Sequence, residues 1–540
     1  ALLHGVTASG KTQVYIRLIE ETLAMGRTAM LLVPEIALTP QMMAKFTAYF
    51  GENVAMLHSG LQLTERYDQW KRIRRGDVRV VLGTRSAVFA PLENVGLIVI
   101  DEEHDGSYQS ESAPRYNTLD VARFRADYNG AKIVIGSATP SVESYKRAEE
   151  GVYNLAKMPE RVNKRALPEV EIVDMRREVR RGNNTVFSSA LKAELDRALS
   201  CGNQAIVFLN QRGYSKSVIC TSCGYVPTCE ACDVALTYHL EEGALKCHYC
   251  NAKYKMIEKC PVCGSTFLRY GGVGTQRAVN ELQKLFPAAR ILRMDRDTTQ
   301  NKEGHLKILR DFAGKKADIL VGTQMIAKGH DFPSVTLVGI LDADMSLHFS
   351  DYRSGERTFQ LITQVAGRSG RAGETGKVVL QTYQPENNVL RYAVNYDYKG
   401  FYESEIALRR ATGFPPFTEI IRVLVSAEDD GKAYIGAQAS NAASIKRYGF
   451  MQHIETVTEN PGTAVLGQMV KNLLKNADKV GQTRSISEIW GCDEVTSGVV
   501  LRFNSPAFGI KGNFRITRVE HHYGGAGHTM ALEISALEQV

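Results

Sequence analysis

Residues 5–12 read GVTASGKT, and this stretch decides how the rest of the chain is interpreted. It matches the pattern GxxxxGK[ST], in which glycines let successive backbone N–H groups turn inward around phosphate oxygens. The helix expected after the loop would direct its positive end at the same oxygens. An ordinary glycine turn before a helix is the alternative. We expect Gly5, Gly10, Lys11 and Thr12 to hold the phosphates of a nucleotide, with the Thr12 hydroxyl on Mg²⁺.

The bulk composition indicates an ordinary globular protein with several domains. A chain of 540 residues is too long for one hydrophobic core, and its 44% hydrophobic and 23% charged residues are a typical balance. The net charge of +7 leans only slightly towards nucleic acid. The sequence has no run of 18 apolar residues and no signal-peptide pattern at its start. We therefore predict a cytoplasmic protein without a membrane partner.

Short apolar runs rich in β-branched residues recur through the first 385 residues. Such runs suit strands that are buried on both faces of a parallel sheet, and their number predicts an α/β fold with two lobes. The first lobe is expected over residues 1–165. A charged linker and the start of the second lobe follow over 166–215. A cysteine-rich insertion over 216–270 then interrupts the second lobe, which resumes over 271–430.

A second motif lies at the end of an apolar strand, where Asp101, Glu102, Glu103 and His104 follow one another. In an ATPase, one such carboxylate assists Mg²⁺ and the next polarises the attacking water, so we assign these roles to Asp101 and Glu102. An exposed acidic turn is the alternative, which the preceding buried strand and the upstream phosphate loop disfavour. Another strand ends in GSATP at 136–140, where a hydroxyl pair could sense the nucleotide.

These three motifs, in this order, resemble those of superfamily 2 helicases. The stretch QVAGRSGR at 364–371 resembles the family's arginine motif, in which Arg368 and Arg371 would approach the γ-phosphate of ATP across the cleft between the lobes. A basic loop that touches a phosphate backbone is the alternative. The segment KGHDF resembles the family's nucleotide- and DNA-coupling loop, which implies that Gly329 and Asp331 contact the nucleotide.

Two stretches of the first lobe predict contacts with single-stranded DNA. Thr84 and Arg85, in the segment GTRS, resemble a loop that holds phosphates without reading sequence. Tyr108, Arg115 and Tyr116 lie between the acidic motif and SAT, where related helicases keep an aromatic-rich loop that links DNA contact to hydrolysis. Aromatic residues are also common on surfaces without such a role.

Eight of the ten cysteines lie between residues 220 and 263, in four CxxC pairs. They are Cys220, Cys223, Cys229, Cys232, Cys247, Cys250, Cys260 and Cys263. Eight thiolates suffice for two closed tetrahedral sites, which predicts two structural Zn²⁺ ions. Redox chemistry would need one such motif at the start of a helix rather than four in tandem. Spacing alone leaves open whether neighbouring pairs share a metal or outer pairs enclose inner ones.

Residues 1 to about 430 closely resemble the PriA family of replication-restart helicases. The resemblance rests on NQRGY directly before the insertion and GVGTQ after it, together with VPEIALTPQ at 33–41 and FPPF at 414–417. It implies two RecA-like lobes, 3′-to-5′ unwinding of forked DNA during restart of stalled replication forks, and a bacterial cytoplasmic location. Primosome proteins and single-strand-binding proteins are the implied partners.

The family resemblance also implies a nested arrangement of the two zinc sites. The outer site would use Cys220, Cys223, Cys260 and Cys263. The inner site would use Cys229, Cys232, Cys247 and Cys250.

The chain departs from the family at three places. Ala8 stands where the family usually has glycine, and the cost of that change depends on the φ angle of the loop. The family's N-terminal domains are absent, so we expect an N-terminal truncation. The third departure is the C-terminal part, because from about residue 439 the chain resembles instead the end of phage tail or baseplate proteins of the XkdQ type. We predict an unrelated α+β or mainly β module over 431–540, with the junction near 431–440.

Within this module, the patterns predict an amphipathic helix over 459–479 and a hairpin whose strands, FRITRVEHHY and HTMALEIS, flank GGAG. Three functions are therefore considered for the whole chain. The leading one is an ATP-dependent DNA helicase core. The others are a zinc-stapled primosome scaffold that has lost helicase activity through truncation, and a phage tail component that acts through its C-terminal module.

Overall fold

The computed structural model of the chain divides it into two compact units, Ala1–Phe417 and Thr418–Val540. It describes residues 1–34, 40–110, 114–162, 166–183, 185–209, 218–231, 234–239, 242–247, 250, 252–295, 298, 302–323, 326, 332–349, 351–369, 376–418, 422–425, 454–457, 468, 483–490, 500–505, 510–524 and 527–536. Within these ranges, no helix has both the length and the apolar character that crossing a bilayer would require.

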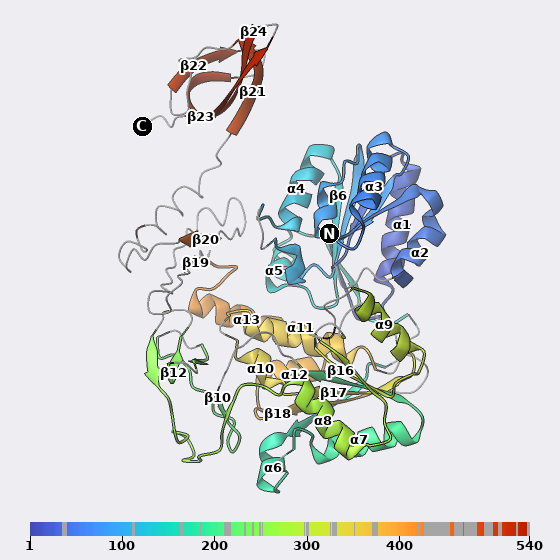
Figure 1. Cartoon of the computed structure of the whole chain (residues 1–540), viewed down its shortest axis with the longest axis vertical. Coiled ribbons are helices and arrows are strands. Elements are labelled where there is room, and N and C mark those ends of the chain that lie inside the picture. The colour runs from blue at the N-terminus through green and yellow to red at the C-terminus, as the bar shows by residue number, and fades with distance from the viewer. Residues whose placement is uncertain are drawn as a thin grey trace. The chain divides into compact units, whose positions relative to one another are not determined.

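The first lobe is a seven-stranded sheet in the order β3-β4-β2-β5-β6-β1-β7, and all its strand pairs are parallel. Its helices flank this sheet (Figure 1). The strands are β1 (Leu2–Gly5), β2 (Thr28–Leu32), β3 (Val54–Leu57), β4 (Val80–Gly83), β5 (Val95–Asp101), β6 (Lys132–Ser137) and β7 (Leu155–Met158). The helices are α1 (Lys11–Ala24), α2 (Pro40–Phe50), α3 (Leu63–Arg75), α4 (Thr118–Asn129) and α5 (Val142–Glu149), with short 3₁₀ turns η2 (Gly51–Asn53), η3 (Arg85–Phe89) and η4 (Gly106–Tyr108). Because β1 lies between β6 and β7, the phosphate loop emerges from inside the sheet.

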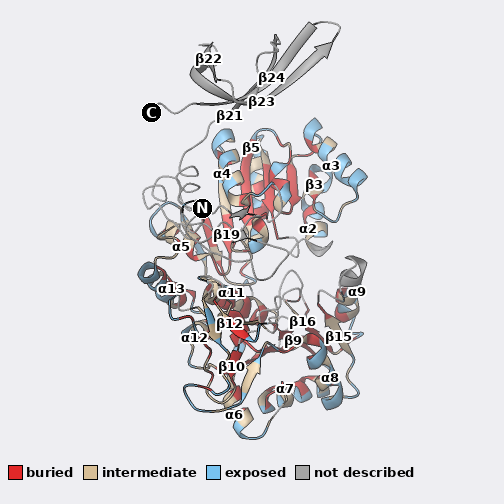
Figure 2. Cartoon of the chain, turned by 60° about the vertical axis from the view of Figure 1, so that its left-hand side comes forward, coloured by how far each residue is buried: buried red, intermediate tan, exposed pale blue. Residues whose placement is uncertain are grey.

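Successive residues of the central strands pack on opposite faces of this sheet. Met30 and Ile98 pack in the same core as residues of α4 and α5, whereas Leu31 and Val99 pack with α1 and α2. Both faces are therefore covered, as the near-continuous apolar runs predict. Figure 2 shows the buried residues gathered on the strands, with exposed residues on outer helices such as α3 and α4.

The second lobe is a six-stranded parallel sheet in the order β15-β16-β9-β17-β18-β8. Its strands are β8 (Glu169–Asp174), β9 (Gln204–Leu209), β15 (Ile291–Met294), β16 (Ile319–Gly322), β17 (Val335–Leu341) and β18 (Lys377–Thr382). Its helices are α6 (Met175–Arg180), α7 (Ser189–Ser200), α8 (Thr275–Leu285), α9 (Lys302–Ala313), α10 (Asp344–Leu347), α11 (Ser354–Ala366), α12 (Asn388–Val394) and α13 (Tyr398–Thr412). The predicted α/β fold with two parallel-sheet lobes is confirmed.

The cysteine-rich insertion lies between β9 and α8, and its described residues form short antiparallel strands. β10 (Val218–Cys220) pairs with β14 (Leu268–Tyr270), which brings the two ends of the insertion together. β11 (Thr237–His239), β12 (Ala244–Lys246) and β13 (Lys253–Lys255) form a separate three-stranded sheet between them. In the sequence, the three-stranded sheet β11-β12-β13 therefore lies between the two paired strands β10 and β14.

The C-terminal unit is mainly β in its described residues. β19 (Arg422–Val425) pairs in parallel with β20 (Ile454–Val457). β21 (Thr483–Trp490), β22 (Val500–Ser505), β23 (Ile510–Gly524) and β24 (Gly527–Ala536) form an antiparallel sheet in the order β21-β24-β23-β22. The predicted hairpin is present, since Tyr523 pairs with His528 and Gly524 with Gly527.

Two further sequence predictions concern the same unit. The helix predicted over 459–479 lies outside the described residues apart from Gln468. The division between the two units falls after Phe417, whereas the sequence places the start of the module at residue 431.

Candidate nucleotide site and cysteine clusters

The phosphate loop between β1 and α1 is shaped as an anion cradle. Gly10 has a φ of +92°, which glycine adopts readily, and a Cβ atom on Gly5 would lie 2.6 Å from Ser9 Oγ. The Nζ atom of Lys11 donates to the carbonyl of Gly5 at 2.9 Å, which holds the lysine over the loop. Within the described residues, Ser9 Oγ is buried without a hydrogen-bond partner. These features fit a bound phosphate, which would supply the missing acceptor.

Ala8 takes the left-handed conformation that the glycine of related sequences would favour. Its φ is +65°, so its Cβ atom crowds the backbone. The substitution that the sequence marks as a departure is therefore strained, at a cost of about 1 kcal/mol.

The acidic motif follows β5 directly beside this loop. Asp101 accepts a hydrogen bond from the Tyr15 hydroxyl at 2.8 Å, and burial, together with the adjacent charge of Glu102, raises the Asp101 pKa to about 6. Glu102 has a φ of +48°, which directs its side chain out of the strand. Its Oε2 atom is buried, makes no hydrogen bond among the described residues and lies 3.6 Å from His104 Nδ1. A carboxyl group left in this state suits a Mg²⁺ ion or a water molecule held on one.

His104 joins the acidic motif to both the SAT segment and the second lobe. Gln364 Nε2 lies 2.8 Å from His104 Nε2, and His104 Nδ1 lies 2.8 Å from Ser137 Oγ. An amide nitrogen can only donate, so His104 Nε2 accepts and the ring proton lies on Nδ1, which donates to Ser137. The predicted motifs of the two lobes are thus in direct contact.

The arginine-bearing turn after α11 packs on the phosphate loop. A Cβ atom on Gly367 would lie 3.1 Å from Thr7 Cγ2, so the backbone of this turn approaches the loop closely. Arg368 is the next residue, and it is half-buried. Arg371, Gly329 and Asp331 lie outside the described residues.

Two of the residues predicted to contact DNA have buried side chains. Thr84 is 2% exposed and Tyr108 is 4% exposed. The Tyr108 hydroxyl donates to the backbone carbonyls of Leu32, at 3.0 Å, and Asp101, at 2.6 Å. Both side chains are buried within the first lobe, and a contact of either residue with DNA stays a prediction. Tyr108 supports the strand that carries Asp101.

Arg85 also makes contacts within the lobe, because its Nη1 atom donates to the carbonyls of Ser107 and Gln109 at 3.2 and 2.8 Å. It thereby ties the GTRS loop to the aromatic segment. Arg115 is exposed, and the ring of Tyr116 packs edge-to-face on that of Phe89, with 4.8 Å between ring centroids.

Phe89 is 54% exposed and is a candidate DNA-contacting residue that sequence reasoning missed. The available signal was an aromatic residue three positions after the GTRS loop. Most phenylalanines in such positions are buried, so the signal is weak.

The cysteines form two clusters in the nested arrangement that the family resemblance implies. Cys220, Cys223, Cys260 and Cys263 form one, and Cys229, Cys247 and Cys250 form the other, with all sulfur atoms of a cluster within 4.8 Å of one another. Cys232, the expected fourth member of the second, lies outside the described residues.

The sulfur spacing within the clusters fits zinc. The Sγ atoms of Cys220 and Cys263 are 3.7 Å apart, and those of Cys223 and Cys260 are 3.6 Å apart. A tetrahedral ion with Zn–S bonds of about 2.3 Å places its sulfurs about 3.8 Å apart, whereas a disulfide requires about 2.05 Å. The thiols are thus spaced as metal ligands and not as disulfide partners.

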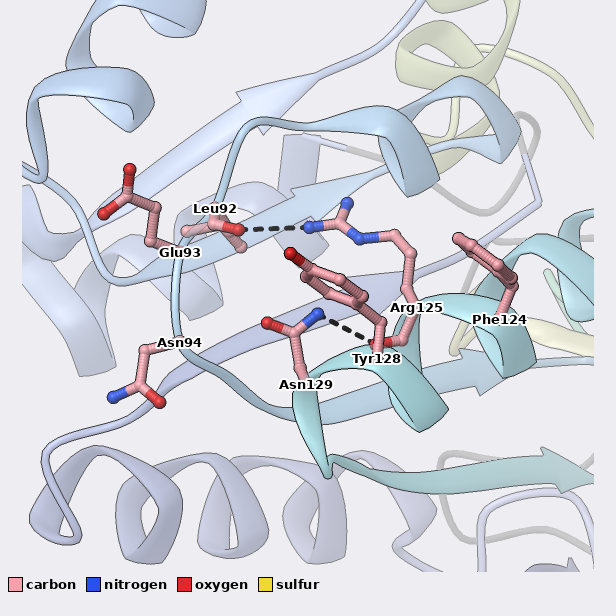
Figure 3. A pocket seen from close by; sticks show the side chains of 7 residues that line it. All are labelled: Leu92, Glu93, Asn94, Phe124, Arg125, Tyr128 and Asn129. Carbon is pink, nitrogen blue, oxygen red and sulfur yellow. Dashed lines mark hydrogen bonds between the residues drawn. The ribbon is translucent and has the colours of Figure 1, made fainter. Parts of the chain in front are cut away.

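A hollow of about 310 Å³ on the first lobe lies away from these sites (Figure 3). It is lined by Leu92, Glu93, Asn94, Phe124, Arg125, Tyr128 and Asn129. These residues precede β5 and β6, whereas ligands of parallel sheets bind beyond the carboxyl ends of the strands. Arg125 serves the fold there, since its guanidinium donates to the carbonyls of Val88, Ala90 and Leu92.

Four family models match the chain. They are DEAD/DEAH box helicase over residues 1–148, helicase conserved C-terminal domain over 273–373, PriA DNA helicase Cys-rich region domain over 229–255, and YQBQ-like over 418–535. The helicase matches contain the phosphate loop, the acidic motif and the arginine motif. The YQBQ-like match begins where the second structural unit begins.

The chain is also similar to curated proteins named Replication restart protein PriA. That of Bacillus subtilis (strain 168) is 52% identical over 437 residues, which cover 81% of this chain and 54% of that protein. Over about four fifths of its length, the chain belongs to the PriA family. The PriA proteins of Synechocystis and Treponema pallidum are 45% and 43% identical, covering 78% and 82% of this chain and 52% and 66% of those proteins. The chain thus spans little more than half the length of the first of these relatives.

Solved helicase structures resemble the chain more distantly. RecG bound to a three-way DNA junction is 18% identical with a TM-score of 0.44, covering 75% of this chain and 43% of that one. Dbp5 of S. cerevisiae bound to RNA and ADP BeF3 is 13% identical with a TM-score of 0.43, covering 76% and 89%. The assignment to the PriA family rests on the sequence relatives.

Proposed function

We propose that residues 1–417 are the core of an ATP- and Mg²⁺-dependent DNA helicase that translocates 3′ to 5′ and acts in the restart of stalled replication forks. The observation that carries this proposal is the contact of Gly367 with Thr7, which puts the arginine turn of one lobe on the phosphate loop of the other. ATP hydrolysis at such an interface couples nucleotide state to lobe position. Membership of the PriA family supports the restart role and the forked DNA substrate.

The roles of the site residues follow from their positions. Lys11 would contact the β- and γ-phosphates, while Thr12 and Asp101 would hold Mg²⁺. The metal supplies neutralisation of phosphate charge. Glu102 would orient and polarise the attacking water through Oε2, which makes no hydrogen bond within the described residues, and Arg368 would stabilise charge that develops on the γ-phosphate. We retain Arg371, Gly329 and Asp331 in the proposal on the family resemblance.

We propose that DNA runs past the rim of the first lobe formed by Phe89, Arg115 and Tyr116. An arginine beside two aromatic rings suits a single strand, because the guanidinium binds phosphate and the rings stack with bases. Primosome proteins and single-strand-binding proteins are the proposed partners by family membership.

An ATPase assay with and without DNA tests this function. Forked or single-stranded DNA is expected to raise the hydrolysis rate of the full chain at least tenfold. Lys11→Ala should abolish hydrolysis, whereas Lys132→Ala, an exposed lysine of β6, should leave it within twofold. An unstimulated rate, or undiminished hydrolysis in Lys11→Ala, contradicts the proposal.

We also propose that each cysteine cluster holds one structural Zn²⁺. Purified protein should then contain two zinc ions per chain by metal analysis. Cys260→Ala should lose one of them, because three thiolates no longer close the outer site. Cys201→Ala, which alters an exposed cysteine outside both clusters, should lose none. Retention of both ions in Cys260→Ala would rule out the outer site.

The YQBQ-like match favours a separate role for the C-terminal unit. We propose that Thr418–Val540 takes no part in ATP hydrolysis. A variant that ends at Phe417 should keep DNA-stimulated hydrolysis within about twofold of the full chain. Loss of stimulation would instead make the unit part of the helicase.

A further inference from the structure

Helix α11 lies against the first lobe along one continuous stripe. Glu356, Gln360, Gln364 and Gly367 are spaced by four, four and three residues, so they share one face of the helix. Gln364 and Gly367 belong to the arginine motif, and they contact His104 and Thr7 as described above. Gln360 and Glu356 lie one and two turns further upstream, respectively, and belong to no motif that the sequence identified.

Glu356 binds the amino end of α5 in the first lobe. Its Oε1 atom accepts a hydrogen bond from the backbone N–H of Val142, the first residue of α5, at 3.0 Å. The first amides of a helix lack partners within it, and a negative charge there is favourable. Gln360 Nε2 donates to the carbonyl of Thr139 at 3.4 Å, in the SAT segment. Both upstream residues therefore hold the segment that follows β6.

Arg409 of α13 holds the Glu356 side chain in place. Its Nη2 atom donates to Glu356 Oε2 at 2.7 Å, and its side chain is only 1% exposed. The same guanidinium contacts Glu405 at 2.9 Å and Glu143 at 3.3 Å. A buried carboxylate needs such compensation, since an unpaired one would be strongly destabilising. Arg409 thus fixes the position of the Glu356 side chain, which accepts the hydrogen bond from the amino end of α5.

The amino end of α5 is also bound from the acidic motif. Glu103 Oε1 accepts from the N–H of Ser141 at 2.6 Å, and its Oε2 accepts from the hydroxyls of Ser141 and Ser144 at 3.1 and 3.0 Å. Two carboxylates therefore meet at one helix end. One follows Glu102 in the first lobe, and the other is carried by α11 of the second.

We propose that Glu356 is a positioning residue that sets where α11, and with it Arg368, lies relative to Glu102. The reference point is the amino end of α5, which Glu103 ties to the acidic motif. Glu356 does not touch the nucleotide and acts through Val142 and the helix that carries Arg368. This inference rests on the proposed ATPase function for its consequence, but the contact itself is independent of that function.

The test compares Glu356→Ala and Glu356→Gln in the full chain. Removal of the acceptor is expected to lower kcat for DNA-stimulated ATP hydrolysis at least tenfold while KM for ATP changes less than about twofold, because the phosphate loop is intact. Glu356→Gln should recover most of kcat, since its amide oxygen can still accept from Val142. Hydrogen exchange of a peptide that covers 142–149 should speed up in the alanine variant without nucleotide and return towards the wild-type rate in the glutamine variant.

A matched control and a milder variant complete the design. Glu194 of α7 is 16% exposed and pairs with Lys377 at 2.9 Å within the second lobe, so Glu194→Ala should change neither kcat nor the exchange of 142–149. Gln360→Ala, which keeps the ion pair of Glu356 with Arg409, should lower kcat several-fold and serves if Glu356→Ala does not fold.

The possible failures are distinguishable. If the wild-type chain shows no DNA-stimulated hydrolysis, the proposed function fails, while the exchange data still decide whether Glu356 holds α5. If the wild-type chain is active and kcat is unchanged in both Glu356→Ala and Gln360→Ala, the positioning role is overturned. Loss of kcat in Glu356→Ala without recovery in Glu356→Gln also overturns it, because the acceptor oxygen is then not what matters.

Discussion

The nucleotide site and the joint between α5, α11 and α13 both bury carboxylates, but they treat them in opposite ways. At the nucleotide site, burial and the charge of Glu102 raise the pKa of Asp101 to about 6, and Glu102 Oε2 has no hydrogen-bond partner within the described residues. At the joint, burial also opposes ionisation of Glu143, yet Arg353 and Arg409 lower its pKa to about 2. At the nucleotide site Lys11 offsets only part of the cost of ionising Asp101, whereas at the joint two arginines of the chain form ion pairs with Glu143.

This difference separates a binding site from a structural connection. Buried polar atoms without partners are rare in folded proteins because they are costly, so a group of them indicates a ligand that completes them. The charges of the joint form ion pairs with one another, so they need no ligand to compensate them. Neutralising a carboxylate should therefore have different consequences in the two regions.

Glu102→Gln is expected to give the largest effect. The amide keeps the shape of the side chain but cannot polarise water, so kcat for ATP hydrolysis should fall at least a hundredfold. Stability should stay nearly constant, because Glu102 Oε2 makes no hydrogen bond within the described residues and the side chain is 29% exposed. ATPase assays and calorimetric melting measure both quantities. Glu21→Gln, on the exposed face of α1, is the control and should change neither kcat nor the melting temperature. A lower melting temperature in Glu102→Gln would contradict the difference proposed between the two regions.

Glu143→Gln should do the reverse and destabilise the protein. It leaves Arg353 and Arg409 with less compensation, and the lowering of the pKa from 4.5 to about 2 corresponds to roughly 3 kcal/mol of unfolding free energy. Because the pKa is lower in the folded state, this stabilisation is present above pH 4.5 and is lost as the pH falls towards 2. The difference in melting temperature between wild type and variant should therefore shrink from pH 7 to pH 3. A difference that does not depend on pH would contradict the assignment.

Ala8→Gly tests a smaller effect at the nucleotide site. Relief of the left-handed strain should stabilise the first lobe by about 1 kcal/mol, seen as a higher melting temperature. Ala193→Gly, at an exposed position within α7, should lower stability by about 1 kcal/mol, since glycine is unfavourable inside a helix. If both changes had the same sign, strain at Ala8 would not be the cause.

The sequence predicts those parts of the fold that local pattern controls. Continuous apolar runs predict strands buried on both faces, and the runs ending at Leu32 and Asp101 are central strands of the first sheet. Residues 166–215 were expected to hold a charged linker and the start of the second lobe, and within them residues 169–174 form β8, the edge strand of the second sheet. The motif residues Lys11, Asp101 and Glu102 were found because each follows a strand in a known order.

The joint could not be predicted, because its residues carry no local signal. Arg409 stands in the segment ALRRAT, and a basic residue late in a helix is usually solvated. Its burial depends on Glu143 and Glu356, which lie 266 and 53 residues away. Tyr108 is the opposite case. An aromatic residue in a polar segment is expected to be exposed, and its burial follows only from its contact with the strand that carries Asp101.

The contacts of α13 also bear on how the chain folds during synthesis. The Tyr398 hydroxyl donates to the carbonyl of Pro140 at 2.9 Å, across 258 residues of sequence, and the Tyr398 ring lies 5.0 Å from the rings of both His4 and Tyr145. At about 5–20 residues per second, a ribosome adds those residues in roughly 13 to 50 s. During that interval the nucleotide-binding lobe has emerged without the aromatic cover that α13 provides. Helix α13, which contacts the first lobe, is thus synthesised long after that lobe has left the ribosome.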